Sequence, residues 1–240
     1  MKISFCTSIC NRLHQLSQTF DHNVSLIQEN PDTEWVILNF GSDDGLHEFM
    51  LSKLEGISQR IIYANETSKR KWHMSAGKNS SHFIATGDIL VNLDCDNYIH
   101  NDINFIRQKF SSGVQIMRTW TGIHGDGTCG RVLITKSAFE QLGGYDEKFY
   151  PAGYQDIDFF ERAVASNFKY DIHISAEYKA IINDKEDTVK NTGIVDVSWK
   201  QMNIANQQTS LNNIKNGILK ANQPDGFYIP QTEIFRGVVA

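Results

Sequence analysis

Short apolar runs alternate with longer amphipathic stretches through the first hundred residues of the chain. The apolar runs predict strands at residues 2–6, 35–40, 60–63 and 88–93. The stretches between them predict helices, as where Leu13, Leu16 and Phe20 recur at helical spacing. Regular alternation of strand and helix favours a parallel, doubly wound α/β sheet, whose ligands bind beyond the carboxyl ends of the strands.

The order of elements changes after Asp102. Strands are predicted at 114–117 and 131–135, and helices at 136–142, 156–166 and 198–219. Gly143 and Gly144 follow the first of these helices and predict its end. The last fifty residues are polar and rich in Asn and Gln, and we expect them to wrap the body of the protein. No linker or internal repeat marks a boundary, so one domain is expected over residues 1–240.

The amino-acid composition and net charge exclude several classes of protein. With 240 residues, 40% of them hydrophobic, the chain is long enough for a sizeable core. A net charge of −5 gives no electrostatic reason to bind nucleic acid or an anionic membrane. The four cysteines match neither a zinc knuckle nor a disulfide framework, so free thiols are expected. Neither a signal peptide nor an apolar run of 18 residues is found, which predicts a cytoplasmic protein.

Two carboxylates follow the predicted strand at 88–93. Asp94 and Asp96 are two residues apart, and in an extended segment such residues project to the same side. Paired carboxylate oxygens suit a hard cation such as Mg²⁺ or Mn²⁺, which keeps positions open for a substrate diphosphate. The alternative is a solvated acidic turn.

A second acidic position lies where a Pro/Gly loop enters the predicted helix 156–166. Asp156 falls in the first turn, where the helix dipole favours an ionised carboxylate that can accept a proton. The alternative role for Asp156 is a plain N-cap. Asp158 and Arg162 are four residues apart and can pair on the helix, which predicts a role in orientation for Asp158.

Other candidates have two interpretations. Trp120 precedes a Gly-rich loop and either packs against a sugar face or belongs to the core. The basic run Lys69-Arg70-Lys71 is typical of a solvated helix face, with diphosphate contact as the alternative. The histidines show no zinc-ligand spacing.

The order of these motifs resembles the GT-A glycosyltransferases of family 2 type, and the second half is similar to the β-1,4-galactosyltransferase group. The segments that carry the resemblance are Cys10-Asn11-Arg12, Lys78-Asn79, the strand into Asp94-Cys95-Asp96, residues 130–147, and Gln155-Asp156-Ile157-Asp158. They span roughly residues 1–190. The resemblance implies a GT-A fold, with a mostly parallel central sheet flanked by helices.

The resemblance also implies roles for individual residues. Asp156 stands at the position of the catalytic base, and Asp94 and Asp96 at the metal-binding motif. Contacts with the donor are implied for Thr7, Asn11, Arg12, Asn39, Lys78, Asn79, Asp94 and Asp96. On the acceptor side we expect Trp120, Tyr150, Tyr154 and Asp158.

The chain departs from the family at several positions. Asn39 stands where many members have the Asp that reads the nucleobase, and Gln155 replaces an acidic residue. Where the family supplies a His as a further metal ligand, this chain has Asn183, followed by Asp184. Asn183 is the predicted third ligand, and Asp184 is an alternative. His173 is the rival, but it falls in a predicted strand and is expected to be structural.

The motifs and the resemblance together imply a metal-dependent inverting glycosyltransferase that uses Mn²⁺ or Mg²⁺. The expected donor is a nucleotide-diphosphate sugar, such as UDP-Gal, UDP-GalNAc, UDP-Glc or UDP-GlcNAc, and the expected acceptor a glycan or glycolipid hydroxyl. Residues 1–100 would bind the donor, 101–182 would hold the acceptor and catalytic base, and 183–240 would form the tail. Bacterial surface glycan synthesis near the inner face of the membrane is the expected setting. The alternatives are a nucleotidyltransferase and a non-catalytic sugar-nucleotide-binding module.

Overall fold

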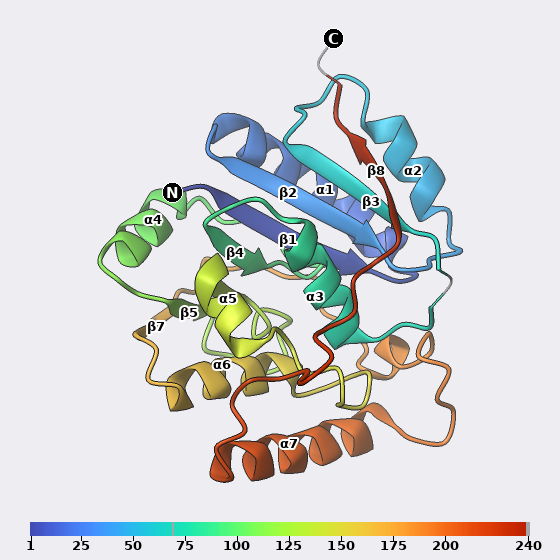
Figure 1. Ribbon diagram of the computed structural model, residues 1–240. Coiled ribbons are helices and arrows are strands. Elements are labelled where there is room, and N and C mark those ends of the chain that lie inside the picture. The colour runs from blue at the N-terminus through green and yellow to red at the C-terminus, as the bar shows by residue number, and fades with distance from the viewer. Residues whose placement is uncertain (69, 239–240) are drawn as a thin grey trace.

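A computed structural model describes residues 1–68 and 70–238; Lys69, the first residue of the basic run, lies outside this range. The centre is an eight-stranded sheet (Figure 1). Its strands, in the order in which they lie side by side, are β7 (Tyr170–Ile174), β5 (Ile116–Trp120), β6 (Val132–Thr135), β4 (Ile89–Asn92), β1 (Ile3–Ile9), β2 (Thr33–Asn39), β3 (Ile61–Glu66) and β8 (Thr232–Arg236). The α/β fold predicted from the sequence is confirmed.

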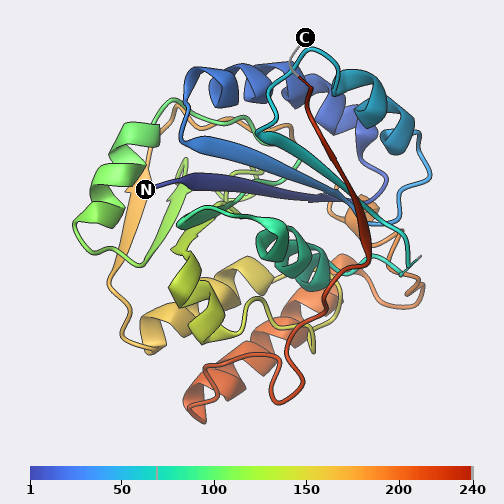
Figure 2. The ribbon, with the colours of Figure 1, turned by 45° about the horizontal axis from the view of Figure 1, so that its top comes forward.

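Helices cover both faces of the sheet (Figure 2). One face packs against α1 (Leu13–Glu29), α2 (Leu46–Lys53) and α4 (Ile103–Ser111). The other face packs against α3 (Met74–Ile84), α5 (Lys136–Leu142) and α6 (Gln155–Ala165). The side chains of β1 alternate between the two apolar cores, because successive residues of a strand point to opposite faces.

In the described part of the chain the sheet is mixed, with four parallel and three antiparallel pairs of neighbouring strands, so parallel pairs are the majority, as predicted. The pairs β1–β2, β1–β4, β2–β3 and β5–β7 are parallel, whereas β4–β6, β5–β6 and β3–β8 are antiparallel. The predicted βαβ units account only for the first half. β6 follows β5 through a loop without a crossover helix, so it can return antiparallel to its neighbours.

The C-terminal segment crosses the molecule, as the sequence predicted. It passes from the 3₁₀ turn η1 (Glu186–Thr188) to α7 (Trp199–Lys215), which packs on α6, and then returns past α3 to the edge of the sheet as β8 (Figure 1). Ser198 begins α7 with a capping box, in which its side chain and that of Gln201 each bond the other's backbone.

Arg70 and Lys71 of the basic run do not lie on a helix, contrary to the prediction. Helix α3 begins at Met74, after His73, whose ring caps it by accepting a hydrogen bond from the Ala76 amide. The Arg70 guanidinium lies 4.2 Å above the ring of Tyr228 in the C-terminal segment. The four cysteines are free thiols, as predicted.

Candidate active site

The acidic pair lies immediately beyond the end of β4. Leu93 extends the pairing with β1 by one backbone hydrogen bond, from its amide to the Cys6 carbonyl at 2.9 Å. Its own carbonyl accepts a hydrogen bond from the Thr7 hydroxyl at 2.7 Å. Beyond this anchor, the Asp94 side chain is 38% exposed, while Asp96 is buried.

Asp156 lies in the first turn of α6, as predicted. The helix starts abruptly because Tyr154 has a positive φ of 68° and its carbonyl accepts the first helical hydrogen bond, from the Asp158 amide. This geometry directs the Asp156 carboxylate back toward the end of β4. Its side chain is 22% exposed, so a substrate can reach it.

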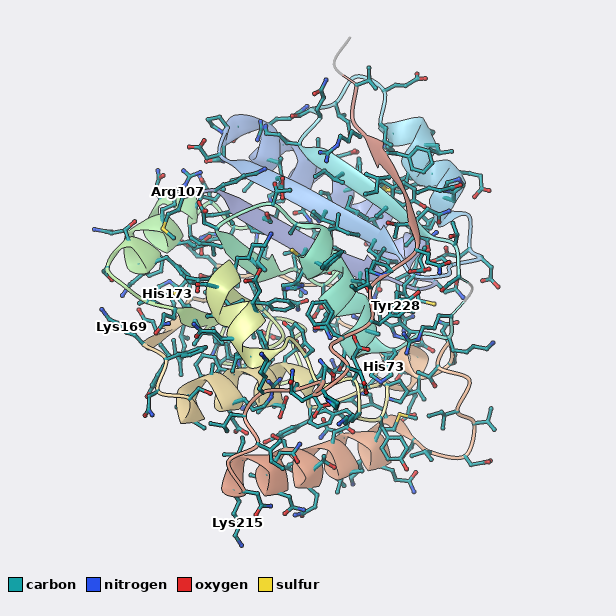
Figure 3. All side chains as sticks on the ribbon, in the orientation of Figure 1. His73, Arg107, Lys169, His173, Lys215 and Tyr228 are labelled. Atoms are coloured by element: carbon teal, nitrogen blue, oxygen red, sulfur yellow. The ribbon has the colours of Figure 1, made fainter. Side chains whose placement is uncertain are left out.

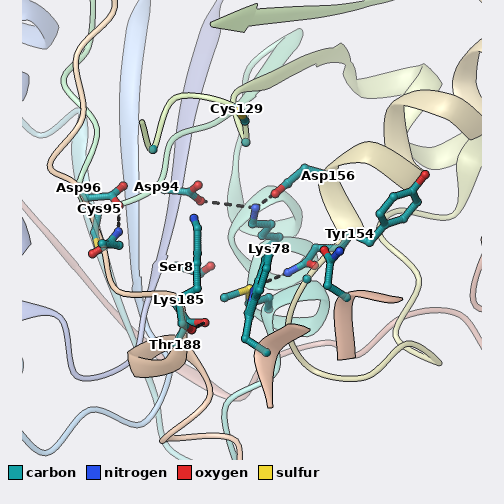
Figure 4. A pocket seen from close by; sticks show the side chains of 18 of the residues that line it. Ser8, Lys78, Asp94, Cys95, Asp96, Cys129, Tyr154, Asp156, Lys185 and Thr188 are labelled. Carbon is teal, nitrogen blue, oxygen red and sulfur yellow. Dashed lines mark hydrogen bonds and ion pairs between the residues drawn. The ribbon is translucent and has the colours of Figure 1, made fainter. Parts of the chain in front are cut away.

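Lys78 of α3 joins the two acidic positions. Its ammonium lies 2.5 Å from Asp156 Oδ1 and 3.4 Å from Asp94 Oδ1, and the side chain is only 6% exposed (Figure 4). A buried cation shared by two carboxylates fixes their separation more firmly than an exposed ion pair would. The acid pair after β4 and the acid of α6 therefore belong to one site.

Burial and the neighbouring charges shift the pKa of each of the three acids in this site. Burial alone would raise the pKa of Asp94, but the Lys78 ammonium and the Asn92 amide outweigh burial and lower it. Burial, together with the charge of Asp94, raises the pKa of Asp96 to about 7. Burial also raises the pKa of Asp156, although Lys78 opposes the shift. A carboxyl with a raised pKa is a stronger base when ionised, which suits proton transfer.

Gly130, just before β6, leaves room between the two acids. A Cβ atom at this position would lie 2.7 Å from Asp94 Oδ2 and 3.2 Å from Asp156 Oδ2. The first distance is too short for any side chain without a shift of the carboxylate. The absence of a side chain at Gly130 thus lets both carboxylates face the same space.

That space is a cavity of about 380 Å³. Seven of the predicted site residues line it, namely Arg12, Lys78, Asp94, Asp96, Tyr154, Asp156 and Asn183. They come from the start of α1, from α3, from the end of β4, from α6 and from the segment after β7. The cavity therefore lies at the carboxyl ends of the strands, where the sequence predicted a ligand to bind.

Four predicted donor contacts are not among the cavity-lining residues, and three of them are described first. Thr7 is buried and binds the Leu93 carbonyl and the Trp35 ring nitrogen. Asn39 is buried and bonds to Tyr63 and Asn65. Asn11 has a φ of 54° and bonds to the Asp43 amide and to Asn191. In this structure the side chains of these residues hold the loops that surround the cavity.

The fourth such donor residue, Asn79, is also buried and bonds both backbone groups of Tyr145. Three predicted acceptor-side residues are likewise not among the residues that line the cavity. Trp120 is covered by the Arg118 guanidinium at 4.7 Å, Tyr150 is 44% exposed on the outside, and Asp158 is fully buried. The Asp158 carboxylate accepts a hydrogen bond from Arg162 Nε at 2.8 Å, which is the orienting pair predicted from the spacing.

The predicted rival ligand, His173, lies away from the cavity. Figure 3 labels His173, which belongs to β7. Its ring packs against that of Phe105 of α4, with 4.5 Å between the ring centroids. The structural role expected for this histidine agrees with that position.

Asn183 reaches the acidic pair from the segment after β7. The Ile181 amide binds the Asp96 carbonyl at 2.8 Å, and this contact brings the Asn183 side chain against Asp96. The Asn183 amide nitrogen donates to Asp96 Oδ2, and its oxygen accepts from Gln15. A half-turn of the amide group would exchange these two atoms, so its oxygen can also face the acidic pair.

The donor set fits a hard divalent cation. Asp94, Asp96 and Asn183 supply only oxygen ligands when the amide is turned, and Mg²⁺ and Mn²⁺ prefer such ligands. In residues 1–68 and 70–238, no three His, Cys, Asp or Glu side chains lie close enough together to share a metal ion. A cation held here would therefore take its remaining ligands from substrate or water. Asp184 is exposed, and its carboxylate caps the Glu186 amide.

Several cavity residues were not predicted. They include Gln15, Trp72, Met74, Arg118, Lys185, Thr188, Trp199 and Asn203. Lys185 follows Asn183 by two residues, a spacing that places both side chains on one side of an extended segment and was a usable signal. Trp199 and Asn203 lie one helical turn apart on α7, and only the packing of α7 on α6 brings them to the cavity.

One part of the chain matches the model of a known protein family. Residues 107–182, which include Gly130, Asp156 and Asp158, match the family described as the N-terminal domain of galactosyltransferase. A search of the curated protein sequences gives no match.

Solved structures share the fold at low sequence identity. One is TarS of S. aureus in complex with UDP-GlcNAc (13% identity, TM-score 0.66, 94% of this chain and 68% of that chain). Another is the catalytic domain of Drosophila β1,4-galactosyltransferase 7 with xylobiose (14%, 0.56, 85% and 80%). A third is the mannosyltransferase PcManGT from Pyrobaculum calidifontis with GDP-Man and Mn²⁺ (15%, 0.55, 73% and 56%).

The fold is therefore that of the GT-A glycosyltransferases. Together with the galactosyltransferase family match, it supports the class of protein that the motifs predicted, a glycosyltransferase. None of the helices in residues 1–68 and 70–238 combines the length and apolar character that crossing a bilayer requires.

Proposed function

We propose that the protein is a metal-dependent, inverting glycosyltransferase that moves a sugar from a nucleotide-diphosphate donor to an acceptor hydroxyl. The observation that carries the proposal is the single cavity that Asp94, Asp96 and Asp156 share, with Lys78 bound between the acid pair and the α6 acid. A site with a cation position and a separate carboxylate base has the two parts that such a transfer needs.

In the proposed reaction, the acceptor oxygen attacks the anomeric carbon of the donor sugar while Asp156 takes the hydroxyl proton. The bond between that carbon and the β-phosphate oxygen breaks, and the nucleoside diphosphate leaves with the bonding electron pair. One displacement with no covalent intermediate inverts the anomeric centre. The Lys78 ammonium favours the ionised form of Asp156 and holds its carboxylate at the cavity.

Asp94 and Asp96 are the proposed metal ligands, with Asn183 as a third through its amide oxygen. A bound Mn²⁺ or Mg²⁺ would neutralise charge on the departing diphosphate. Structures of similar fold are described with UDP-Gal and manganese or with GDP-Man and Mn²⁺, which supports this choice of cofactor.

The donor is proposed to be a UDP-sugar, since two of the similar structures are complexes with UDP-Gal or UDP-GlcNAc. The acceptor side is proposed to lie around Tyr154, the neighbour of Asp156 in the cavity. A glycan or glycolipid of a bacterial surface is the proposed acceptor class, with the reaction on the cytoplasmic side.

A nucleotide-release screen tests the proposal. The purified chain is incubated with UDP- and GDP-sugars, with Mn²⁺ or with EDTA, and the free nucleoside diphosphate is measured. The proposal expects slow Mn²⁺-dependent release from one donor class. Release of pyrophosphate from nucleoside triphosphates would instead indicate a nucleotidyltransferase, and binding without turnover in the presence of candidate acceptors would indicate a binding module.

Two substitutions separate the roles of the acids. Asp156→Asn should lower transfer by about 10²- to 10⁴-fold, the usual contribution of a general base, and leave nucleotide affinity near the parent value. Asp96→Ala should lower transfer and also weaken Mn²⁺-dependent nucleotide binding. Equal transfer by Asp156→Asn and the parent chain would refute the assignment of the base.

A further inference from the structure

Lys185 is a cation of the cavity for which the reaction above gives no role. Its side chain lines the cavity, and Figure 4 shows it extending toward the Asp94 carboxylate, on the opposite side from Cys129. It follows Asn183 in the segment that the Ile181 amide fastens to Asp96. The same contact therefore positions the predicted third metal ligand and this ammonium.

The formal charges of the residues that line the cavity favour an anionic ligand. Of the described residues that line it, Arg12, Lys78, Arg118 and Lys185 are cationic, and Asp94, Asp96 and Asp156 are anionic, a balance of 4 − 3 = +1. A divalent cation on the acid pair would add two positive charges. A diphosphate supplies the negative charge that this arrangement lacks.

Lys78 could bind the diphosphate only by breaking its ion pairs with Asp156 and Asp94. Its buried ammonium is already shared between Asp156 and Asp94. Arg118 is directed elsewhere, since its Nε donates to the Cys129 carbonyl at 3.2 Å and its guanidinium stacks on Trp120. Arg12 and Lys185 take part in none of the ion pairs within 4 Å in the described part of the chain. Of these two, Lys185 is the one whose side chain Figure 4 shows extending toward the acid pair.

We propose that Lys185 binds the terminal phosphate of the nucleoside diphosphate leaving group, beside the acid pair. This inference rests on the proposed function. When the bond to the sugar breaks, the β-phosphate oxygen gains a negative charge, and an ammonium next to it stabilises that charge more than it stabilises the intact donor. Lys185 would thus assist departure of the leaving group while Asp156 acts on the acceptor.

Nucleotide titrations of the full-length chain test this role. UDP and UMP, and in parallel GDP and GMP, are titrated by calorimetry in saturating Mn²⁺. Lys185→Met should lower affinity for the diphosphate by at least about tenfold, as expected for loss of a charge-assisted hydrogen bond. Affinity for the monophosphate should change by less than twofold.

Two further variants complete the experiment. Lys185→Arg should recover most of the diphosphate affinity, because it keeps the charge. Lys190→Met is the matched control, since Lys190 is in the same segment, is exposed, and pairs with Asp187 outside the cavity; it should leave both affinities unchanged. In turnover, Lys185→Met should lower kcat more than it raises KM for the donor.

The outcomes distinguish this inference from the proposed function. If the parent chain binds neither UDP nor GDP, the proposed function fails and this role fails with it. If the parent binds a diphosphate and Lys185→Met binds it equally well, only the role of Lys185 is overturned. An equal loss for diphosphate and monophosphate would also overturn it, because the contact would then not involve the terminal phosphate.

Discussion

Gly130 has no side chain, and this leaves the space that the carboxylates of Asp94 and Asp156 share. We predict that Gly130→Ala lowers transfer by about a hundredfold, the cost of displacing a catalytic group by roughly 1 Å. Gly130 does not have a positive φ, so alanine fits its backbone and the thermal midpoint should change little. The check is a rate measurement beside a melting curve. Parent-like transfer by this variant would contradict the shared-space geometry.

His82 of α3 gives a prediction for stability against pH. Its ring is fully buried and stacked on Phe139 at 5.1 Å. Burial lowers the pKa of His82 to about 3, so the folded state keeps it neutral while the unfolded chain binds a proton below about pH 6.5. Stability from this group is therefore complete above pH 6.5 and falls as the pH drops toward 3.

Between pH 7 and pH 5, His82 alone should lower the free energy of unfolding by about 2 kcal/mol. His82→Phe keeps a ring in the stack and removes the titration. Urea unfolding of both chains at the two pH values measures the difference. The same pH dependence in parent and variant would show that His82 does not titrate as described.

Single residues were predictable where the signal was local. Asp94 and Asp96 follow an apolar strand, and Asp156 begins a helix, so position along the chain suggested their surroundings. The pairing of Lys78 with Asp156 was not predictable, because it joins residues 78 positions apart. Asn79 was assigned to the donor on resemblance, and the structure shows both its polar atoms bonded within the protein.

At the level of elements, α7 fixes the loop that leads into α6. Asn206 of α7 is buried, accepts a hydrogen bond from the Tyr150 amide, and donates to the carbonyls of Tyr150, Ala152 and Gly153. The loop before α6 forms no helix or strand. The hydrogen bonds from Asn206 therefore satisfy backbone groups of the loop that regular secondary structure would otherwise satisfy. Because Asp156 follows directly, the position of the base depends on this contact.

We predict that Asn206→Ala lowers the free energy of unfolding by about 2–3 kcal/mol, since it leaves buried backbone groups without partners. It should also lower kcat, because the start of α6 loosens. Gln208→Ala is the control, as Gln208 lies exposed on the same helix and should cost only a few tenths of a kcal/mol. Denaturant unfolding and rate measurements of the two variants give the comparison. Equal stability of Asn206→Ala and the control would contradict this role.

Most elements followed from hydrophobic periodicity, and the exceptions have a physical reason. The predicted helices at 136–142 and 156–166 agree with α5 and α6 to within a residue. Strand β8 was missed because its five residues are mostly exposed on a sheet edge, where no alternation of buried and exposed positions is needed. Its pairing with β3 is set by the path of the C-terminal segment.

At the scale of the molecule, the sequence predicted the architecture and the edge of the sheet that carries the site. It did not predict the antiparallel part of the sheet, because direction depends on how loops return and not on the strands themselves. It also missed Trp199 and Asn203, since the cavity is assembled from residues between Ser8 and Asn203. Long-range packing, which leaves little trace in local patterns, supplies that side of the site.

The central claim is that one nucleotide-sugar lies with its diphosphate at Asp94 and Asp96 and its sugar toward Asp156. Crystals grown with Mn²⁺ and UDP, measured by anomalous scattering, test it most directly. We expect a manganese peak bonded to a carboxylate of the acid pair and to the diphosphate, with the terminal phosphate facing the side of the cavity where Asp156 lies. A peak elsewhere, or a nucleotide bound outside this cavity, would contradict the account.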